Sequence, residues 1–87
     1  MKILFTEKAW DDYLWLSENN DQLHKKANTL IKDIQRTPFA GLGKPEFLKG
    51  PLQGHLSRRL NAEHRIVYQV KDQIITFISF RFHYDNL

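Results

Sequence analysis

The sequence predicts an α+β fold in which an N-terminal strand and a two-helix antiparallel hairpin precede an antiparallel β-meander. Apolar residues recur at helical spacing before Pro38 and alternate at period two after the glycine- and proline-containing segment FAGLGKP. The chain has 87 residues, of which 41% are hydrophobic, so it can bury one modest core. We therefore expect a single domain over residues 1–87, with both helices packed on one face of the sheet.

The first half is expected to form a short strand and then two helices. The apolar run KILF predicts the strand, and Thr6 is a suitable N-cap for a helix that extends to about Ser17. Asp21 can cap the second helix, which should end before Pro38 because proline disfavours helical geometry in the preceding residue. The break between the helices is short, which predicts an antiparallel hairpin. The second helix carries an apolar stripe formed by Leu23, Ala27, Leu30, Ile31 and Ile34.

Strands are expected throughout the second half, joined by short turns such as the one at residues 71–73. Side chains in a strand alternate between the two faces of a sheet, so one set in each strand can face the helices. If the more apolar set of each strand faces the helices, Arg59, Arg65 and His83 lie together on the opposite, uncovered face of the sheet. The sets expected to face the helices are Leu56, Arg58 and Leu60, then Ile66, Tyr68 and Val70, and then Ile74, Ile78, Phe80 and Phe82.

The net charge of +3 is concentrated in the second half of the chain. Up to Gly43, six lysines and arginines are balanced by six acidic residues, whereas after Gly43 seven basic residues face four acidic ones. A basic half suggests a polyanionic partner, and nucleic acid is the first such partner to consider.

The composition also predicts where the protein resides. The start MKILFTEKAWDDY has only three strongly apolar residues before charges return, too few for a signal peptide. No run approaches the roughly 18 apolar residues that a membrane-spanning helix needs. The chain has no cysteine, which agrees with a reducing compartment. We expect a soluble, cytoplasmic protein.

The closing stretch SFRFHYDNL suggests acid–base chemistry on RNA. Phosphodiester cleavage within RNA needs a base for the 2′-hydroxyl group, an acid for the leaving 5′-oxygen and positive charge at the phosphate. His83 suits the acid, because imidazole is readily protonated near neutral pH. Arg65 suits the phosphate, because guanidinium offers paired donors in a rigid fork. Tyr84 can stack on a nucleobase.

Three residues are candidates for the base, and spacing alone does not choose among Glu46, Glu63 and His64. Glu46 has the more suggestive setting, because Lys44 and Lys49 flank it. Each candidate also has an ordinary structural explanation. A histidine at the end of a strand is more often a packing or surface residue, and an arginine on an open sheet face is usually solvated.

The sequence suggests no cofactor. It has no cysteine, no histidine pair at ligand spacing and no cluster of carboxylates that would indicate a metal site. The nucleophile should then come from the substrate, and RNA carries a 2′-hydroxyl group beside each scissile phosphate. The expected reaction is a metal-independent transesterification.

The order of GKPEFLKG, SRRLNAEHRIVYQV and a closing RFHY resembles the YoeB-type toxins of the RelE/ParE superfamily. The segments WDDYLWL and IKDIQRTPFAGLGKPE are similar to that family too, so the resemblance covers nearly the whole chain. It implies a RelE-like fold and a ribosome-dependent mRNA endonuclease that cleaves at the A-site codon and inhibits translation. It also implies a cognate, YefM-like antitoxin encoded nearby, while the choice between monomer and homodimer stays open.

The resemblance assigns roles to individual residues. It implies that Glu46 is the general base, that His83 is the general acid and that Arg65 stabilises the pentacovalent phosphate. It also implies that Tyr84 orients the substrate or stacks on it. Substrate contacts beside these are expected from Lys44, Lys49 and Arg59.

Two other functions stay open. ParE-type relatives share the fold but poison DNA gyrase and lack this acid–base set, so the presence of Glu46, Arg65 and His83 argues against that function. A non-catalytic RNA-binding module would keep the basic face but would not need Glu46.

Overall fold

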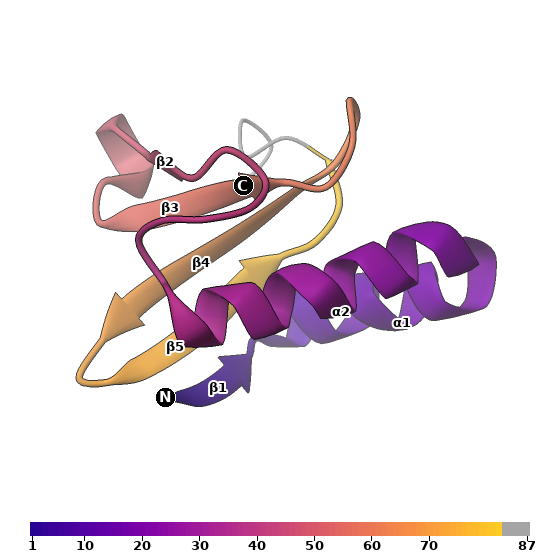
Figure 1. Ribbon diagram of the computed structural model, residues 1–87, viewed down its shortest axis with the longest axis horizontal. Helices are drawn as coiled ribbons and strands as arrows, with labels where there is room; N and C mark the ends of the chain where they lie inside the picture. The colour runs from indigo at the N-terminus through magenta and orange to yellow at the C-terminus, as the bar shows by residue number, and fades with distance from the viewer. Residues whose placement is uncertain (83–87) are drawn as a thin grey trace.

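The computed structural model describes residues 1–82 and places two helices against one face of a five-stranded sheet (Figure 1). The expected α+β class, N-terminal strand and helical hairpin are confirmed. In chain order the elements are β1 (Lys2–Phe5), α1 (Glu7–Asn19), α2 (Asp21–Arg36), β2 (Glu46–Phe47), the 3₁₀ helix η1 (Gly50–Leu52), β3 (His55–Arg59), β4 (Arg65–Lys71) and β5 (Ile74–Ser79).

The strand order in the sheet is β1-β5-β4-β3-β2. Neighbouring strands from β2 to β5 are antiparallel, as the meander prediction requires, whereas β1 pairs in parallel with β5. Parallel neighbours need a long connection, and here both helices and the other strands lie between them. The predicted turn at residues 71–73 is confirmed, because Asp72 and Gln73 have φ angles of 55° and 62°, as a tight hairpin turn needs.

The helix ends follow the predictions with one exception. Thr6 caps α1 by accepting a hydrogen bond from the backbone N–H of Ala9. Asn20, and not Asp21, caps α2, because its side-chain oxygen accepts from the N–H of Leu23. The sequence Asn-Asn-Asp offers several capping side chains, and composition alone did not choose among them.

The hydrophobic core lies between the helices and the sheet. The apolar stripe predicted for α2 is buried apart from Leu23, which is only partly covered. Phe5, Tyr13 and Trp15 pack against the edge of this core. The core residues are Ala9, Leu16, Ala27, Leu30, Ile31, Ile34, Leu56, Leu60, Ile66, Tyr68, Ile75, Phe77 and Phe80.

The inward face predicted for β5 is wrong. Ile75 and Phe77 are in the core, whereas Ile74 and Ile78 are only partly buried. Both alternating sets of this strand are apolar, so periodicity could not choose between them. An irregularity in the β4–β5 register also changes the alternation along the sheet. Of the two residues after β5 that are also expected inward, Phe80 is confirmed in the core and Phe82 is 43% exposed.

The sheet face opposite the helices carries the predicted arginines. Arg59 pairs directly with Arg65 across β3 and β4, so their side chains lie on the same face. Glu46 joins that face, since it pairs with Ser57, two residues before Arg59. His83, the third residue expected on this face, lies outside the described residues.

Candidate active site

Glu46 and Arg65 meet on the sheet face opposite the helices. Glu46 begins β2 and Arg65 begins β4, with β3 between the two strands. Arg65 Nη1 lies 3.9 Å from Glu46 Oε2, and their side chains are 20% and 52% exposed. A substrate can therefore reach both the carboxylate and the guanidinium group of this pair.

Of the four predicted substrate-binding residues, Lys44, Lys49 and Arg59 lie within the described part of the chain, and only Arg59 and Lys49 are placed beside a member of this pair. Arg59 is exposed and lies opposite Arg65, an arrangement of like charges that favours an anion between them. Lys49 lines a shallow hollow that Glu46 also lines. Lys44 and Arg59 lie at a hollow of about 380 Å³ together with Lys26, Thr29, Leu30, Leu42, Gly43 and Asn61.

His64, one of the three candidates for the base, is buried, with only 4% of its surface exposed. Its Nδ1 accepts a hydrogen bond from the backbone N–H of Phe82 at 2.7 Å. Its Nε2 lies 3.0 Å from Glu63 Oε1. Because both ring nitrogens face other protein groups, His64 is poorly placed to take a proton from a substrate. This geometry argues against His64, whereas the Glu63 side chain is 68% exposed, so burial does not separate Glu63 from Glu46.

The described chain ends beside Arg65. Arg65 N–H donates to the carbonyl oxygen of Phe82 at 3.2 Å, while the Phe82 N–H donates to His64. Phe82 has a φ angle of 65°, a left-handed conformation that is unusual for a residue other than glycine. His83 and Tyr84, the predicted acid and stacking residue, follow Phe82 directly and lie outside the described residues.

Helix α1 holds the segment that leads to Phe82. Asp12 Oδ2 accepts from the backbone N–H of Phe80 at 3.0 Å and lies within hydrogen-bonding distance of the Ser79 hydroxyl group. Lys8 pairs with the same carboxylate at 2.8 Å. The Arg81 guanidinium group lies 3.7 Å from the centre of the Trp15 ring, a cation–π contact.

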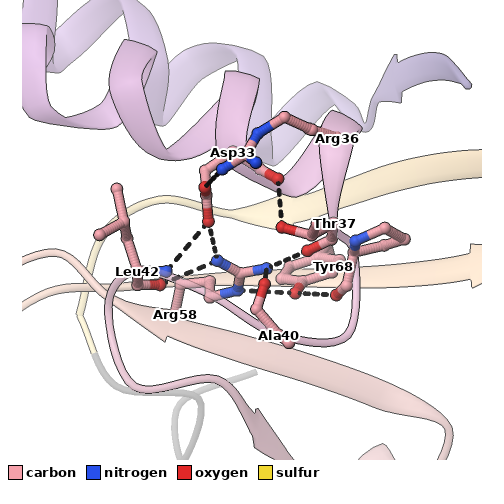
Figure 2. A network of polar contacts seen from close by, with 8 residues as sticks. Asp33, Arg36, Thr37, Ala40, Leu42, Arg58 and Tyr68 are labelled. Carbon is pink, nitrogen blue, oxygen red and sulfur yellow. Dashed lines mark hydrogen bonds and ion pairs between the residues drawn. The ribbon is translucent and has the colours of Figure 1, made fainter.

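A second polar network surrounds the buried side chain of Arg58 on the helix-facing side of the sheet (Figure 2). The ion pair between Arg58 and Asp33 measures 2.8 Å and is buried. The hydrogen bond from Arg58 is the main cause that lowers the pKa of Asp33, and the backbone N–H of Leu42 adds to it. Burial raises the pKa of Tyr68, although its hydrogen bond with Arg58 opposes that change.

Within residues 1–82, no group of three or more histidine, cysteine, aspartate or glutamate side chains is arranged to hold a metal ion. Neither described helix is long and apolar enough to cross a membrane.

The comparisons with known proteins identify the family. A family model described as "YoeB-like toxin of bacterial type II toxin-antitoxin system" matches residues 5–84. The chain belongs to this family of YoeB-like toxins. The YoeB toxin of Synechocystis sp. is 56% identical over 86 residues, which cover 99% of this chain and 100% of that relative.

Solved structures of YoeB-like toxins share the fold. A YoeB/ParE toxin from Agrobacterium tumefaciens has a TM-score of 0.94 and 49% identity, over 97% of this chain and 100% of that one. YoeB from Staphylococcus aureus has been solved as a dimer and in a heterotetrameric complex with YefM. The TM-scores are 0.88 and 0.87, each at 44% identity over 97% of this chain and 98% of that one. The predicted family and RelE-like fold are confirmed.

In this YoeB-like toxin, sequence reasoning missed the residues that hold the segment before Glu46 and the segment before His83. Arg58 had a usable signal, because an arginine at an inward position between Leu56 and Leu60 indicates a buried, paired charge. Asp12 and Asp33 had no such signal, since each is one of several acids on a helix. Their partners are brought to them only by the fold.

Proposed function

We propose that this YoeB-like toxin is a ribosome-dependent endonuclease that cleaves mRNA at the A-site codon and so inhibits translation. The observation that carries the proposal is the Glu46–Arg65 pair on the sheet face opposite the helices, in which the carboxylate is 52% and the guanidinium side chain 20% exposed. A carboxylate beside a guanidinium group offers a proton acceptor and a phosphate ligand within the reach of one nucleotide.

The reaction is a transesterification. Glu46 removes the proton of the 2′-hydroxyl group, and the freed oxygen attacks the adjacent phosphorus. Arg65 neutralises the additional negative charge on the pentacovalent phosphate. The bond between phosphorus and the 5′-oxygen breaks, and His83 protonates that oxygen. The upstream product ends in a 2′,3′-cyclic phosphate or its hydrolysed form, and the downstream product begins with a 5′-hydroxyl group.

The remaining predicted residues bind the substrate. Arg59, opposite Arg65, and Lys49, beside Glu46, are suitable ligands for the phosphates that flank the scissile one. Lys44 extends the positive charge toward the other side of Arg59. Tyr84 orients the nucleotide or stacks on its base.

The proposal includes protein partners. The complex of S. aureus YoeB with YefM supports a YefM-like antitoxin as the partner that holds this chain inactive. The S. aureus dimer supports self-association. We expect the toxin expressed alone to stop growth, and harmless high-level expression of the intact chain would contradict the toxin's action.

The decisive test uses ribosomes that translate a defined mRNA, with the mRNA ends mapped after the toxin is added. Glu46→Gln and His83→Gln should each lower the cleavage rate by about 10²–10⁴-fold, because positioned acid–base groups contribute that much. Glu18→Gln, the same change at an exposed position of α1, is the matched control and should cleave normally. Circular dichroism should be the same for all variants.

A second substrate tests the nucleophile. An mRNA with one 2′-deoxynucleotide immediately upstream of the cut should bind but should not be cleaved there. A 5′-phosphate on the downstream product, or full cleavage at the deoxy position, would show that water is the nucleophile. Gyrase poisoning with intact mRNA would indicate a ParE-type function, and RNA binding without any cut would indicate a non-catalytic module.

A further inference from the structure

Glu46 reaches its place through a very short strand. β2 contains two residues, which pair with β3 as Glu46–Ser57 and Phe47–Leu56, and the next residue, Leu48, donates its N–H to the His55 carbonyl oxygen. The chain arrives there from α2 through residues 37–45, which form neither helix nor strand. So short a ladder is too weak to fix its own position. The location of Glu46 therefore depends both on this short pairing and on the contacts that hold residues 37–45.

One fully buried side chain holds this segment. Arg58, on the helix-facing side of β3, donates through Nη2 to the carbonyl oxygens of Thr37 at 2.7 Å and Ala40 at 2.9 Å. Its Nη1 donates to the carbonyl oxygen of Leu42 at 2.8 Å. Figure 2 shows the segment wrapped around this guanidinium group. Three points of the backbone are thus fixed to one planar group.

The guanidinium group is itself fixed from two other sides. Asp33 Oδ2 accepts from Arg58 Nη1 at 2.8 Å and also from the Leu42 N–H at 3.0 Å. Tyr68 Oη accepts from Arg58 Nε at 3.0 Å and donates to the Pro38 carbonyl oxygen at 2.6 Å. All five N–H groups of the arginine therefore have partners.

Close packing leaves the segment little freedom. Gly41 has a φ angle of 123°, and a Cβ atom there would collide with the Asp33 carboxylate. Gly43 lies against the end of β3, where its carbonyl oxygen accepts a hydrogen bond from the Arg59 N–H. The segment is thus tied to β3 twice shortly before Glu46, through the Arg58 side chain and through the backbone N–H of Arg59.

We propose that Arg58, oriented by Asp33, is a positioning residue for Glu46. It acts through the carbonyl oxygens of residues 37–42 and sets the distance between the Glu46 carboxylate and Arg65. Arg58 faces the core and touches no substrate, so it is not a catalytic residue. The inference rests on the proposed function, since it assigns to Arg58 the alignment of the general base.

The positioning of residues 37–42 requires the planar, branched guanidinium group of an arginine. Lysine keeps the charge and can pair with Asp33, but its ammonium group has three donors at one point and cannot reach three separated carbonyl oxygens. Arg58→Lys should therefore misplace Glu46 without removing the buried charge. We expect a single-turnover cleavage rate roughly 10- to 100-fold lower, because a shift of about 1 Å can cost that much. The ribosome concentration that gives the half-maximal rate should change little.

A double-mutant cycle separates positioning from general destabilisation. If Arg58 acts through Glu46, Arg58→Lys should have little further effect on cleavage in a Glu46→Gln background. Its effect on the urea midpoint should be the same in both backgrounds. Wild-type cleavage by folded Arg58→Lys, or an equal loss of rate in both backgrounds, would overturn the inference. Wild-type cleavage by Glu46→Gln would instead overturn the proposed function.

A milder pair of variants covers the case in which Arg58→Lys does not fold. Tyr68→Phe removes one hydroxyl group that contacts both Arg58 and the Pro38 carbonyl oxygen. Tyr13→Phe removes a hydroxyl group that contacts Asn28 between the two helices. Tyr68→Phe should slow cleavage and Tyr13→Phe should not, when both are folded. Equal rates for the two variants would contradict the proposal.

Discussion

Residues 37–45 lead into Glu46 and residues 79–82 lead into His83, and the two segments differ in how many side chains hold them. The first segment offers its carbonyl oxygens to one buried cation, Arg58. The second offers its N–H groups to separate acceptors, the carboxylate of Asp12 and the imidazole of His64. One anchor is a single hub and the other is distributed along the segment.

Because of this difference, we expect substitutions at the two anchors to have different effects. Loss of Arg58 releases its three carbonyl contacts at once and leaves its buried counter-charge without that partner. Loss of one acceptor in a distributed set releases one N–H group, while the other contacts remain. Substitutions at the hub should therefore affect the whole fold, whereas substitutions beside residues 79–82 should affect the candidate site more than stability.

The largest expected effect comes from removing the hub. Arg58→Ala should lower the free energy of unfolding by about 3–5 kcal/mol, because it leaves a buried carboxylate and several carbonyl oxygens without their donor. Urea unfolding followed by circular dichroism measures this change. Tyr13→Phe is a suitable control outside the network, and a loss no larger than that of the control would show that Arg58 is no hub.

A smaller effect on stability is expected at the distributed anchor. His64→Leu should cost about 1–3 kcal/mol, because it leaves the Phe82 N–H without an acceptor. His64→Asn is the matched variant, since its side-chain oxygen can take the place of Nδ1. Cleavage should fall more in the leucine variant than in the asparagine variant. Equal cleavage by the two would mean that the bond to Phe82 does not help to place the candidate acid.

The smallest expected effect is on the pH dependence of stability. The pKa of Asp33 is lowered from 3.8 by its bond with Arg58, so folding favours the ionised carboxylate. This stabilisation is complete above about pH 3.8 and is lost progressively as the pH falls below that value. Asp33→Asn should therefore flatten the acid limb of a plot of unfolding free energy against pH. An unchanged slope would show that the ion pair between Asp33 and Arg58 does not contribute to stability.

The sequence allowed the elements of the fold to be predicted better than their contacts. The helical stripe and the period-two strands identified α1, α2 and β3 to β5, and alternation placed Arg59 and Arg65 together on the open face. β2 was missed because two residues are too few to show a period. The face of β5 was wrong because both of its sides are apolar.

The candidate site depended on information that periodicity does not contain. The choice of Glu46 over Glu63 and His64 rests on resemblance to a family, and the burial of His64 gives a physical reason only against the histidine. The pairing of Asp33 with Arg58 joins residues far apart in the chain, and only the folded path brings them together. The roles of the site residues stay predictions.

The parallel pairing of β1 with β5 has a consequence for biosynthesis. The first strand that leaves the ribosome finds its partner only when residues 74–77 have emerged, because Lys2–Phe5 pair with those residues. Thr6 adds bonds to Phe77 and Ile78 from the same end of the chain. Such contacts between distant parts of a sequence form late. A nascent chain thus cannot complete the sheet that carries Arg65 while its own last strand is still inside the ribosome that makes it.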